Sequence, residues 1–171
     1  MASLKSKQGQ IAEIVKCGKD PVHFMNKYLK IQHPLRGLIP FKTYPFQDDC
    51  VSEFNDHRFN IVLKSRQLGL STLVAAYAVW QAVFYKDKNI LIIATKLAVA
   101  QNFIRKVKTY IKSMPKWLLV PVITANNKQQ VEFSNGSQIK AVPTSEDAGR
   151  SEALSLLIVD EATFVRNFDE L

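Results

Sequence analysis

The chain has 171 residues, of which 47% are hydrophobic and 22% are charged. This length and composition are typical of one globular domain with its own core, and they exclude a wholly disordered chain. Lysine and arginine number 23 against 15 aspartates and glutamates, which gives a formal net charge of +8. A charge of that sign favours either an anionic partner or a basic surface that contacts solvent alone.

The sequence indicates neither a metal framework nor a membrane segment. Cys17 and Cys50 are too few for a disulfide framework, and the three histidines show no zinc-site spacing. The most apolar stretch, residues 73–85, is shorter than the roughly 20 residues that span a bilayer. The first residues lack the apolar run of a signal peptide. We therefore expect a soluble protein with reduced thiols and no membrane association.

The expected elements begin with a short helical appendage over residues 1–45, with helices near 11–16 and 21–29 and a proline-broken connector. A core domain over residues 46–171 follows. Its pattern predicts a helix at 46–54, a strand at 60–64, a strongly apolar helix at 71–85, a buried strand at 89–94 and an amphipathic helix at 98–114. After a short segment at 120–124, residues 131–134 and 137–142 flank Asn135-Gly136, and 155–160 is a last buried strand.

Strands that alternate with helices predict an α/β fold with a mainly parallel central sheet. The Asn135-Gly136 dipeptide strongly favours the turn of a β-hairpin, so we expect one antiparallel hairpin within the core. The carboxyl ends of parallel strands would then carry the residues that perform the chemistry.

The first motif is Lys-Ser-Arg-Gln-Leu-Gly-Leu-Ser-Thr at residues 64–72, between the expected strand and the apolar helix. Phosphate-binding loops occupy that position, because backbone N–H groups and a helix N-terminus face an anion there. Gly69 and Ser71 fit the pattern G-x-x-x-x-G-K-[ST], but Lys64 replaces the first glycine and Leu70 the usual lysine. Since the two ends of such a loop approach each other, we expect Lys64 to reach the phosphates instead.

Two further side chains of this loop complete the predicted phosphate site. Arg66 adds a second cation, and Ser71 keeps the hydroxyl that Mg²⁺ requires. The alternative interpretation is a plain strand–turn–helix whose cations only face solvent.

The second motif, Leu-Ile-Val-Asp-Glu-Ala at residues 157–162, is an apolar strand that ends in two carboxylates. We expect Asp160 at the carboxyl edge of the sheet, beside the phosphate loop, where it can hold Mg²⁺ through water. Glu161 can polarise an attacking water. Alone, such a motif is weak, but its order and spacing after the first motif make a phosphate-transfer site the favoured interpretation.

Two softer features accompany these motifs. Gln47, in Tyr-Pro-Phe-Gln at 44–47, can read a donor and an acceptor on adenine, or it can simply be solvated. Residues 96–116 carry six cations and no acid, with Phe103, Tyr110 and Trp117 between them. This stretch either follows a phosphate backbone or packs its aromatic side chains in the core and leaves its cations in solvent.

In this order and spacing, the motifs at 44–47, 64–72 and 157–162 resemble the large terminase subunit of tailed bacteriophages. The resemblance extends from about residue 40 to about residue 165. That family's ATPase motor packages DNA into the viral prohead, and its Walker A loop has the lysine moved to the start. The resemblance implies a RecA-like (ASCE) P-loop ATPase core. The family continues with a coupling motif and a nuclease domain, so it also implies a truncated motor domain.

The resemblance further implies a role for each site residue. Glu161 would be catalytic, Arg66 would stabilise the γ-phosphate, and Arg150 would reach into a neighbouring subunit's site. Ser71 and Asp160 would hold Mg²⁺. ATP would be bound by Gln47, Lys64, Ser65, Arg66, Gln67, Leu68, Gly69, Leu70, Ser71 and Thr72.

These roles imply that the protein hydrolyses Mg-ATP to move double-stranded DNA into the prohead. Its expected partners are the portal protein and the small terminase subunit. We expect a homo-oligomeric ring on the portal, a monomer in isolation, and a location in the host cytoplasm and transiently at the portal vertex. One alternative is a superfamily 2-type helicase or translocase, against which Leu70 argues. Another is a non-catalytic module that binds phosphate or DNA.

Overall fold

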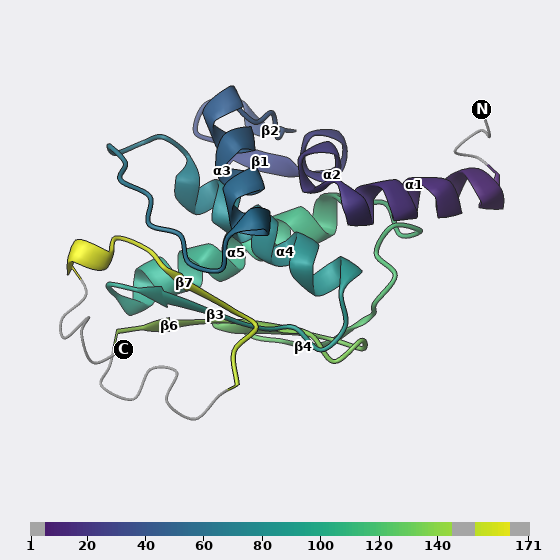
Figure 1. Cartoon of the computed structure of the whole chain (residues 1–171). Coiled ribbons are helices and arrows are strands. Elements are labelled where there is room, and N and C mark those ends of the chain that lie inside the picture. Colours follow the sequence, from purple (N-terminus) through teal and green to yellow (C-terminus); the bar gives the residue numbers. More distant parts are fainter. Residues whose placement is uncertain (1–5, 145–152, 165–171) are drawn as a thin grey trace.

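Residues 6–144 and 153–164 are described by a computed structural model, in which helices cover one face of a sheet (Figure 1). The helices are α1 (Lys7–Lys19), α2 (Pro21–Tyr28), α3 (Pro45–Asp56), α4 (Leu70–Phe84), α5 (Leu97–Ser113) and a 3₁₀ turn, η1 (Ala162–Phe164). The strands are β1 (Lys30–His33), β2 (Gly37–Pro40), β3 (Asn89–Ala94), β4 (Ile123–Asn126), β5 (Gln130–Phe133), β6 (Gln138–Pro143) and β7 (Leu156–Val159).

The N-terminal helices begin where the sequence offers capping residues. The Ser6 side chain accepts a hydrogen bond from the backbone N–H of Gly9 at 3.1 Å, and Asp20 accepts one from His23 N–H at 2.8 Å. Such caps satisfy backbone donors that have no partner within the helix. The expected helices near 11–16 and 21–29 are therefore confirmed as α1 and α2.

A two-stranded antiparallel hairpin, β1–β2, replaces the expected proline-broken connector. Lys30 pairs with Pro40 and His33 with Gly37, and Gly37 turns the chain with a φ of 68°. The prolines mislead here because Pro34 lies in the turn and Pro40 ends a strand. Neither position needs a backbone N–H within the sheet.

The main sheet is mixed, so the expected mainly parallel sheet is wrong. Its strand order is β4-β5-β6-β3-β7. Strand β3 pairs in parallel with β6 and β7, whereas β5 pairs antiparallel with both β4 and β6. The reason is local: β4, β5 and β6 are joined by turns of a few residues, which are too short for a parallel crossover. The expected hairpin around Asn135-Gly136 is confirmed as β5–β6.

The expected strand at 60–64 is also wrong. These residues form no strand pairing with any part of the chain that the structure describes. Ile61 and Leu63 are fully exposed. An apolar segment becomes a strand only where a neighbouring strand accepts its backbone hydrogen bonds, and local hydrophobicity alone does not provide one.

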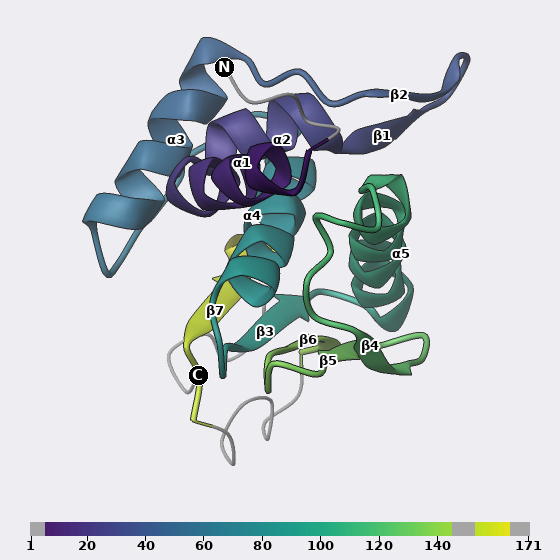
Figure 2. The ribbon, with the colours of Figure 1, turned by 90° about the vertical axis from the view of Figure 1, so that its right-hand side faces the viewer.

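Helix α4 is apolar along its length because other elements surround it. Sheet residues such as Ile90 and Ile92 lie on one side, α5 packs beside it, and the N-terminal elements lie above both helices (Figures 1 and 2). Trp80 of α4 donates its indole N–H to the carbonyl of Cys17 in α1 at 2.8 Å. None of the described helices combines the length and the apolar character that crossing a bilayer requires.

The N-terminal region shares its core with the rest of the chain. Cys17, Phe24, Met25, Leu29 and Phe41 are almost fully buried in the same hydrophobic cluster as α4 and α5. The Phe24 and Phe84 rings meet edge to face with their centroids 5.2 Å apart. The domain boundary at residue 45 stays a prediction, while the core that the two parts share is continuous.

Candidate functional site

Gln47 anchors the predicted phosphate loop to the first turn of α3. Its side-chain nitrogen donates to the carbonyl of Leu68 at 3.0 Å, and its side-chain oxygen accepts from the backbone N–H of Tyr44 at 3.2 Å. The side chain is only 2% exposed. Gln47 therefore positions the loop through both ends of its amide, and its contact with adenine stays a prediction.

The loop itself adopts backbone angles that open it towards solvent. Gln67 and Gly69 lie in the left-handed region, with φ of 66° and 72°. A Cβ at Gly69 would lie 3.0 Å from the side-chain nitrogen of Gln47, so the close contact between α3 and the loop favours glycine. The side chains from Ser65 to Leu68 are exposed, and so is Gly69. Backbone N–H groups at this end of α4 can therefore face an external anion.

Leu70 shows why the usual lysine is absent from this loop. Its side chain is 6% exposed and packs in the main hydrophobic cluster at the start of α4. A lysine at this position would bury a charge among apolar side chains, which is unfavourable without a partner. A phosphate-binding cation of this loop would therefore have to come from another position, and its assignment to Lys64 stays a prediction.

The two motifs meet across the carboxyl edge of the sheet. The Ser71 hydroxyl donates to Asp160 Oδ2 at 2.9 Å, although 89 residues separate the two along the chain. Lys64 Nζ lies 4.0 Å from Asp160 Oδ1, and both side chains are largely buried. The backbone N–H of Asp160 donates to the carbonyl of Ile93, which continues the pairing of β7 with β3.

Glu161 directly follows this contact and is exposed. Its φ of 54° is left-handed, and its carbonyl accepts a hydrogen bond from the N–H of Phe164 at 2.8 Å. The described non-glycine residues with positive φ are Gln67 and Glu161, one in each motif, and Asp87, which lies in the turn before β3. Such backbone strain is typical of functional sites. Arg150 lies outside the described residues.

The arrangement suits a phosphate ester with a magnesium ion. Lys64 and Arg66 supply cations, and the N-terminus of α4 supplies backbone donors. The hydroxyl of Ser71 and the carboxylate of Asp160 lie side by side, and oxygen ligands of this kind are those that Mg²⁺ prefers. The backbone N–H of Thr72 donates a hydrogen bond to the carbonyl of Gly69 where the loop joins α4.

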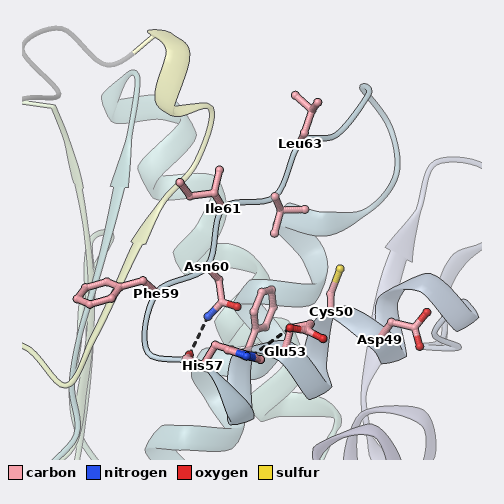
Figure 3. Close-up of a pocket in the computed structure, with 10 residues that line it drawn as sticks. Asp49, Cys50, Glu53, His57, Phe59, Asn60, Ile61 and Leu63 are labelled. Atoms are coloured by element: carbon pink, nitrogen blue, oxygen red, sulfur yellow. Dashed lines mark hydrogen bonds and ion pairs between the residues drawn. The ribbon is translucent and has the colours of Figure 1, made fainter.

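A hollow of about 450 Å³ lies between α3 and the exposed segment 59–63 (Figure 3). Its lining includes the carboxylates of Asp49 and Glu53, and Glu53 pairs with His57 at 3.0 Å. None of the described residues that we expect to bind phosphate lines this hollow. Its carboxylates would repel a phosphate, so we do not assign the nucleotide to this hollow.

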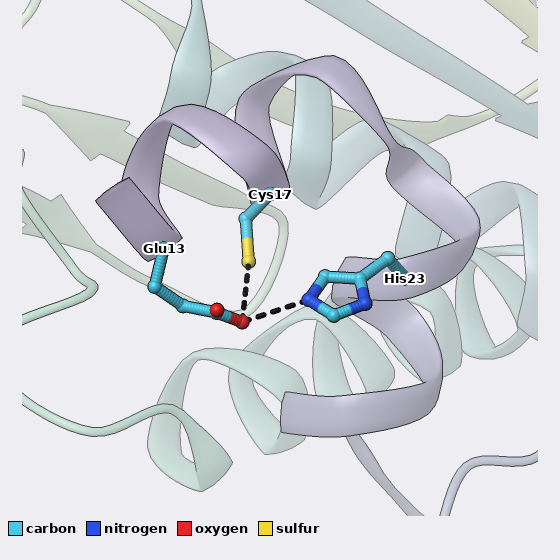
Figure 4. Close-up of side chains that lie close together, drawn as sticks. All are labelled: Glu13, Cys17 and His23. Carbon is cyan, nitrogen blue, oxygen red and sulfur yellow. Dashed lines mark hydrogen bonds and ion pairs between the residues drawn. The ribbon is translucent and has the colours of Figure 1, made fainter. Parts of the chain in front are cut away.

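A second polar cluster joins α1 to α2 and was not expected from the sequence. Oε1 of Glu13 lies 2.7 Å from His23 Nε2 and 3.8 Å from Cys17 Sγ (Figure 4). The same oxygen lies 2.7 Å from Lys27 Nζ and 2.9 Å from Tyr28 Oη. Cysteine, histidine and glutamate are metal ligands in other proteins. Here the ammonium of Lys27 already occupies the place of a cation beside the carboxylate. The cluster is explained as a link between two helices.

Comparisons with known proteins show the family of this chain and a similar fold. The family described as terminase large subunit, T4likevirus-type, N-terminal, matches residues 61–171. The crystal structure of the HK97 bacteriophage large terminase matches with a TM-score of 0.60 and 16% sequence identity. That match covers 83% of this chain and 37% of the HK97 chain. At this identity the likeness shows a shared α/β fold, over little more than a third of the HK97 protein.

Proposed function

We propose, since this chain belongs to the T4likevirus-type terminase large-subunit family and matches its N-terminal part, that it binds and hydrolyses Mg-ATP to drive double-stranded DNA into a prohead. The contact between Ser71 and Asp160 carries the proposal, because it joins the two motifs into one site. The core would be a RecA-like P-loop ATPase core. Family membership leaves the helicase alternative without support.

In this proposal the residues of the chain mainly place positive charges and hydrogen-bond donors around the phosphates of ATP. Lys64 and Arg66 bind phosphate oxygens, and the N-terminus of α4 adds backbone donors. Ser71 and Asp160 hold Mg²⁺, which neutralises phosphate charge when it is bound. Glu161 accepts a proton from the attacking water, for which its exposed position next to Asp160 is suitable. Gln47 holds the loop, and adenine recognition by the same side chain is part of the proposal.

Further parts of the proposal concern the assembled motor. Arg150 would act on the nucleotide of a neighbouring subunit in a ring bound to the portal, as arginine fingers do. The portal protein and the small terminase subunit would be partners, and the isolated chain would be a monomer. The protein would work in the host cytoplasm and transiently at the portal vertex. These partners and places come from the family resemblance.

Nucleotide binding is the direct test. A fluorescent ATP analogue, MANT-ATP, is titrated into the purified chain with and without Mg²⁺, and phosphate release is followed with and without double-stranded DNA. We expect saturable, Mg²⁺-dependent binding and slow phosphate release. Absence of binding would overturn the proposal. Binding with no phosphate release under any condition would instead favour a non-catalytic phosphate-binding module.

A further inference from the structure

The six cations of residues 96–116 do not share one environment, although the sequence suggests a single basic stretch. The ammonium of Lys108 donates a hydrogen bond to the carbonyl of Asn127 at 2.7 Å. The side chain of Lys106 is half-buried. The others are exposed: Lys96, Arg105, Lys112 and Lys116. The buried aromatic residues of this stretch, Phe103 and Tyr110, pack in the core. Lys106 therefore stands apart from the solvated cations.

The packing of α5 on α4 directs Lys106 towards the phosphate loop. Tyr110, which is 1% exposed, donates its hydroxyl to the carbonyl of Thr72 in the first turn of α4 at 3.0 Å. Lys106 precedes Tyr110 by four residues, so the two side chains lie on the same face of α5. The Lys106 ammonium lies 5.2 Å from the centre of the Phe103 ring, a cation–π contact between residues one turn apart on α5.

The charges around Lys106 are those of the predicted site. Burial lowers the pKa of Lys106, the carboxylate of Asp160 raises it, and the charge of Lys64 lowers it further. Within the described residues, Lys106 has no carboxylate within ion-pair distance. Asp160 already accepts the hydroxyl of Ser71 and lies beside Lys64. Among the described residues assigned to this edge of the sheet, three cations, Lys64, Arg66 and Lys106, stand against two carboxylates, Asp160 and Glu161.

We propose that Lys106 is a third phosphate-binding cation of this site, which reaches from α5 to the polyphosphate of the nucleotide beside Lys64 and Arg66. This inference rests on the proposed function and extends it by a residue that neither motif contains. A polyphosphate supplies the negative charge that the described residues lack, and charge-assisted hydrogen bonds to phosphate are among the stronger contacts in proteins. Nucleotide binding would then be coupled directly to the position of α5.

The test compares Lys106→Met, which keeps an apolar stem on Phe103, with Lys106→Arg, which keeps the charge. Lys112→Met removes an exposed charge from the same helix and serves as the matched control. MANT-ATP affinity is measured with Mg²⁺ at constant ionic strength, and tripolyphosphate is used as a competitor that lacks the base. We expect Lys106→Met to weaken both ligands about tenfold, or about 1.4 kcal/mol. Lys106→Arg should bind nearly as the parent does, and Lys112→Met should be unchanged.

A purely structural role for Lys106 predicts a different result. Without nucleotide, we expect Lys106→Met to unfold at the same temperature as the parent or higher, because the substitution removes a half-buried charge. A lower unfolding temperature together with failure of Lys106→Arg to restore binding would overturn the inference. Equal weakening by Lys106→Met and Lys112→Met would also overturn it, because general electrostatics would then be sufficient.

The inference and the proposed function fail in distinguishable ways. If Lys106→Met binds both ligands as the parent does while Lys64→Ala loses binding, only the inference is wrong. If the parent chain shows no saturable binding of MANT-ATP, the proposed function fails and the inference fails with it.

Discussion

Two regions of the chain each place a lysine beside a carboxylate, and their surroundings differ. In the link between α1 and α2, one oxygen of Glu13 has four donors around it, with the Lys27 ammonium at 2.7 Å. At the sheet edge, Asp160 accepts the hydroxyl of Ser71, and the Lys64 ammonium is 4.0 Å away. The first carboxylate has its hydrogen bonds supplied by four groups of the protein, whereas among the described side chains the second has one hydrogen-bond donor and one more distant cation.

The difference separates a structural ion pair from a candidate ligand site. Burial raises the pKa of Glu13, but hydrogen bonds from Lys27, His23 and Tyr28 outweigh it and lower the pKa to about 2. Every group of that cluster is used within the fold. At the sheet edge, exposed loop residues and left-handed backbone leave donors and charge without internal partners among the described residues. Substitutions in the two regions should therefore change different measurements.

The largest expected effect is on turnover at the sheet edge. Glu161→Gln should lower the rate of ATP hydrolysis by about 100-fold or more, because an amide does not accept the proton of the attacking water. Steady-state phosphate release measures the rate, and MANT-ATP affinity should stay within about twofold of the parent. Hydrolysis at the parental rate would remove Glu161 from the catalytic role.

Loss of the displaced lysine should reduce binding without reducing stability. Lys64→Ala is expected to weaken MANT-ATP binding about tenfold or more, because a charge-assisted contact to phosphate is lost. Fluorescence titration gives the affinity, with Lys112→Ala as the control for net charge. Unchanged affinity would show that Lys64 does not replace the lysine that is usual at the position of Leu70.

The link between α1 and α2 should show the opposite behaviour. Glu13→Gln should lower the free energy of unfolding by about 2 kcal/mol, because it replaces the largely buried carboxylate that accepts from Lys27, His23 and Tyr28 with a neutral amide. Nucleotide affinity should not change. Urea unfolding measured by circular dichroism gives the difference between variant and parent.

The same link has a defined pH dependence. Since the folded-state pKa of Glu13 lies near 2, below its ordinary value of 4.5, its stabilising effect is complete above about pH 4.5. It is lost as the pH falls towards 2. The stability difference between parent and Glu13→Gln should therefore be constant near neutral pH and shrink in acid. A difference that instead persists at pH 2 would contradict the assignment of Glu13 as the charged acceptor.

The smallest expected effect concerns the thiols. Burial, together with the charge of Glu13, raises the pKa of Cys17 to about 12, and this residue is 0% exposed. Burial also raises the pKa of Cys50, but its side chain is partly exposed at the hollow beside α3. Iodoacetamide at pH 8 should therefore modify Cys50 at least about tenfold faster than Cys17. Mass spectrometry of peptides identifies the site, and equal rates would indicate that α1 opens readily.

Much of the core was predictable from neighbouring residues. The strand at 89–94 and the hairpin at Asn135-Gly136 were expected where they occur, and α4 and α5 begin and end within one residue of the expected helices. These elements depend on hydrophobic period and turn residues, which are local properties. The Asn135 side chain also donates to carbonyls of Ala82 and Tyr85, which fixes the hairpin against the end of α4.

Strand pairing was less predictable, since a strand exists only with its partner. Residues 60–64 have the composition of a strand but form no pairing in the described chain, and residues 60–63 lie exposed. Residues 30–40 contain prolines and still form β1–β2, because those prolines occupy positions that need no donor. The main sheet is mixed because short turns make β5 antiparallel to both β4 and β6, whereas β6 and β7 pair in parallel with β3.

The candidate site could be predicted from the order of its residues, because the expected phosphate loop and an acidic strand end carry recognisable residue types at fixed spacing. Lys64, Ser71 and Asp160 could be named from that pattern, and packing brings Lys64 and Ser71 each within 4.0 Å of Asp160. The burial of Leu70, the use of Gln47 to hold Leu68, and the approach of α5 to the loop depended on contacts between residues far apart in the chain. Such contacts follow from how α3, α4 and α5 fill space against the sheet, which no short stretch of sequence specifies.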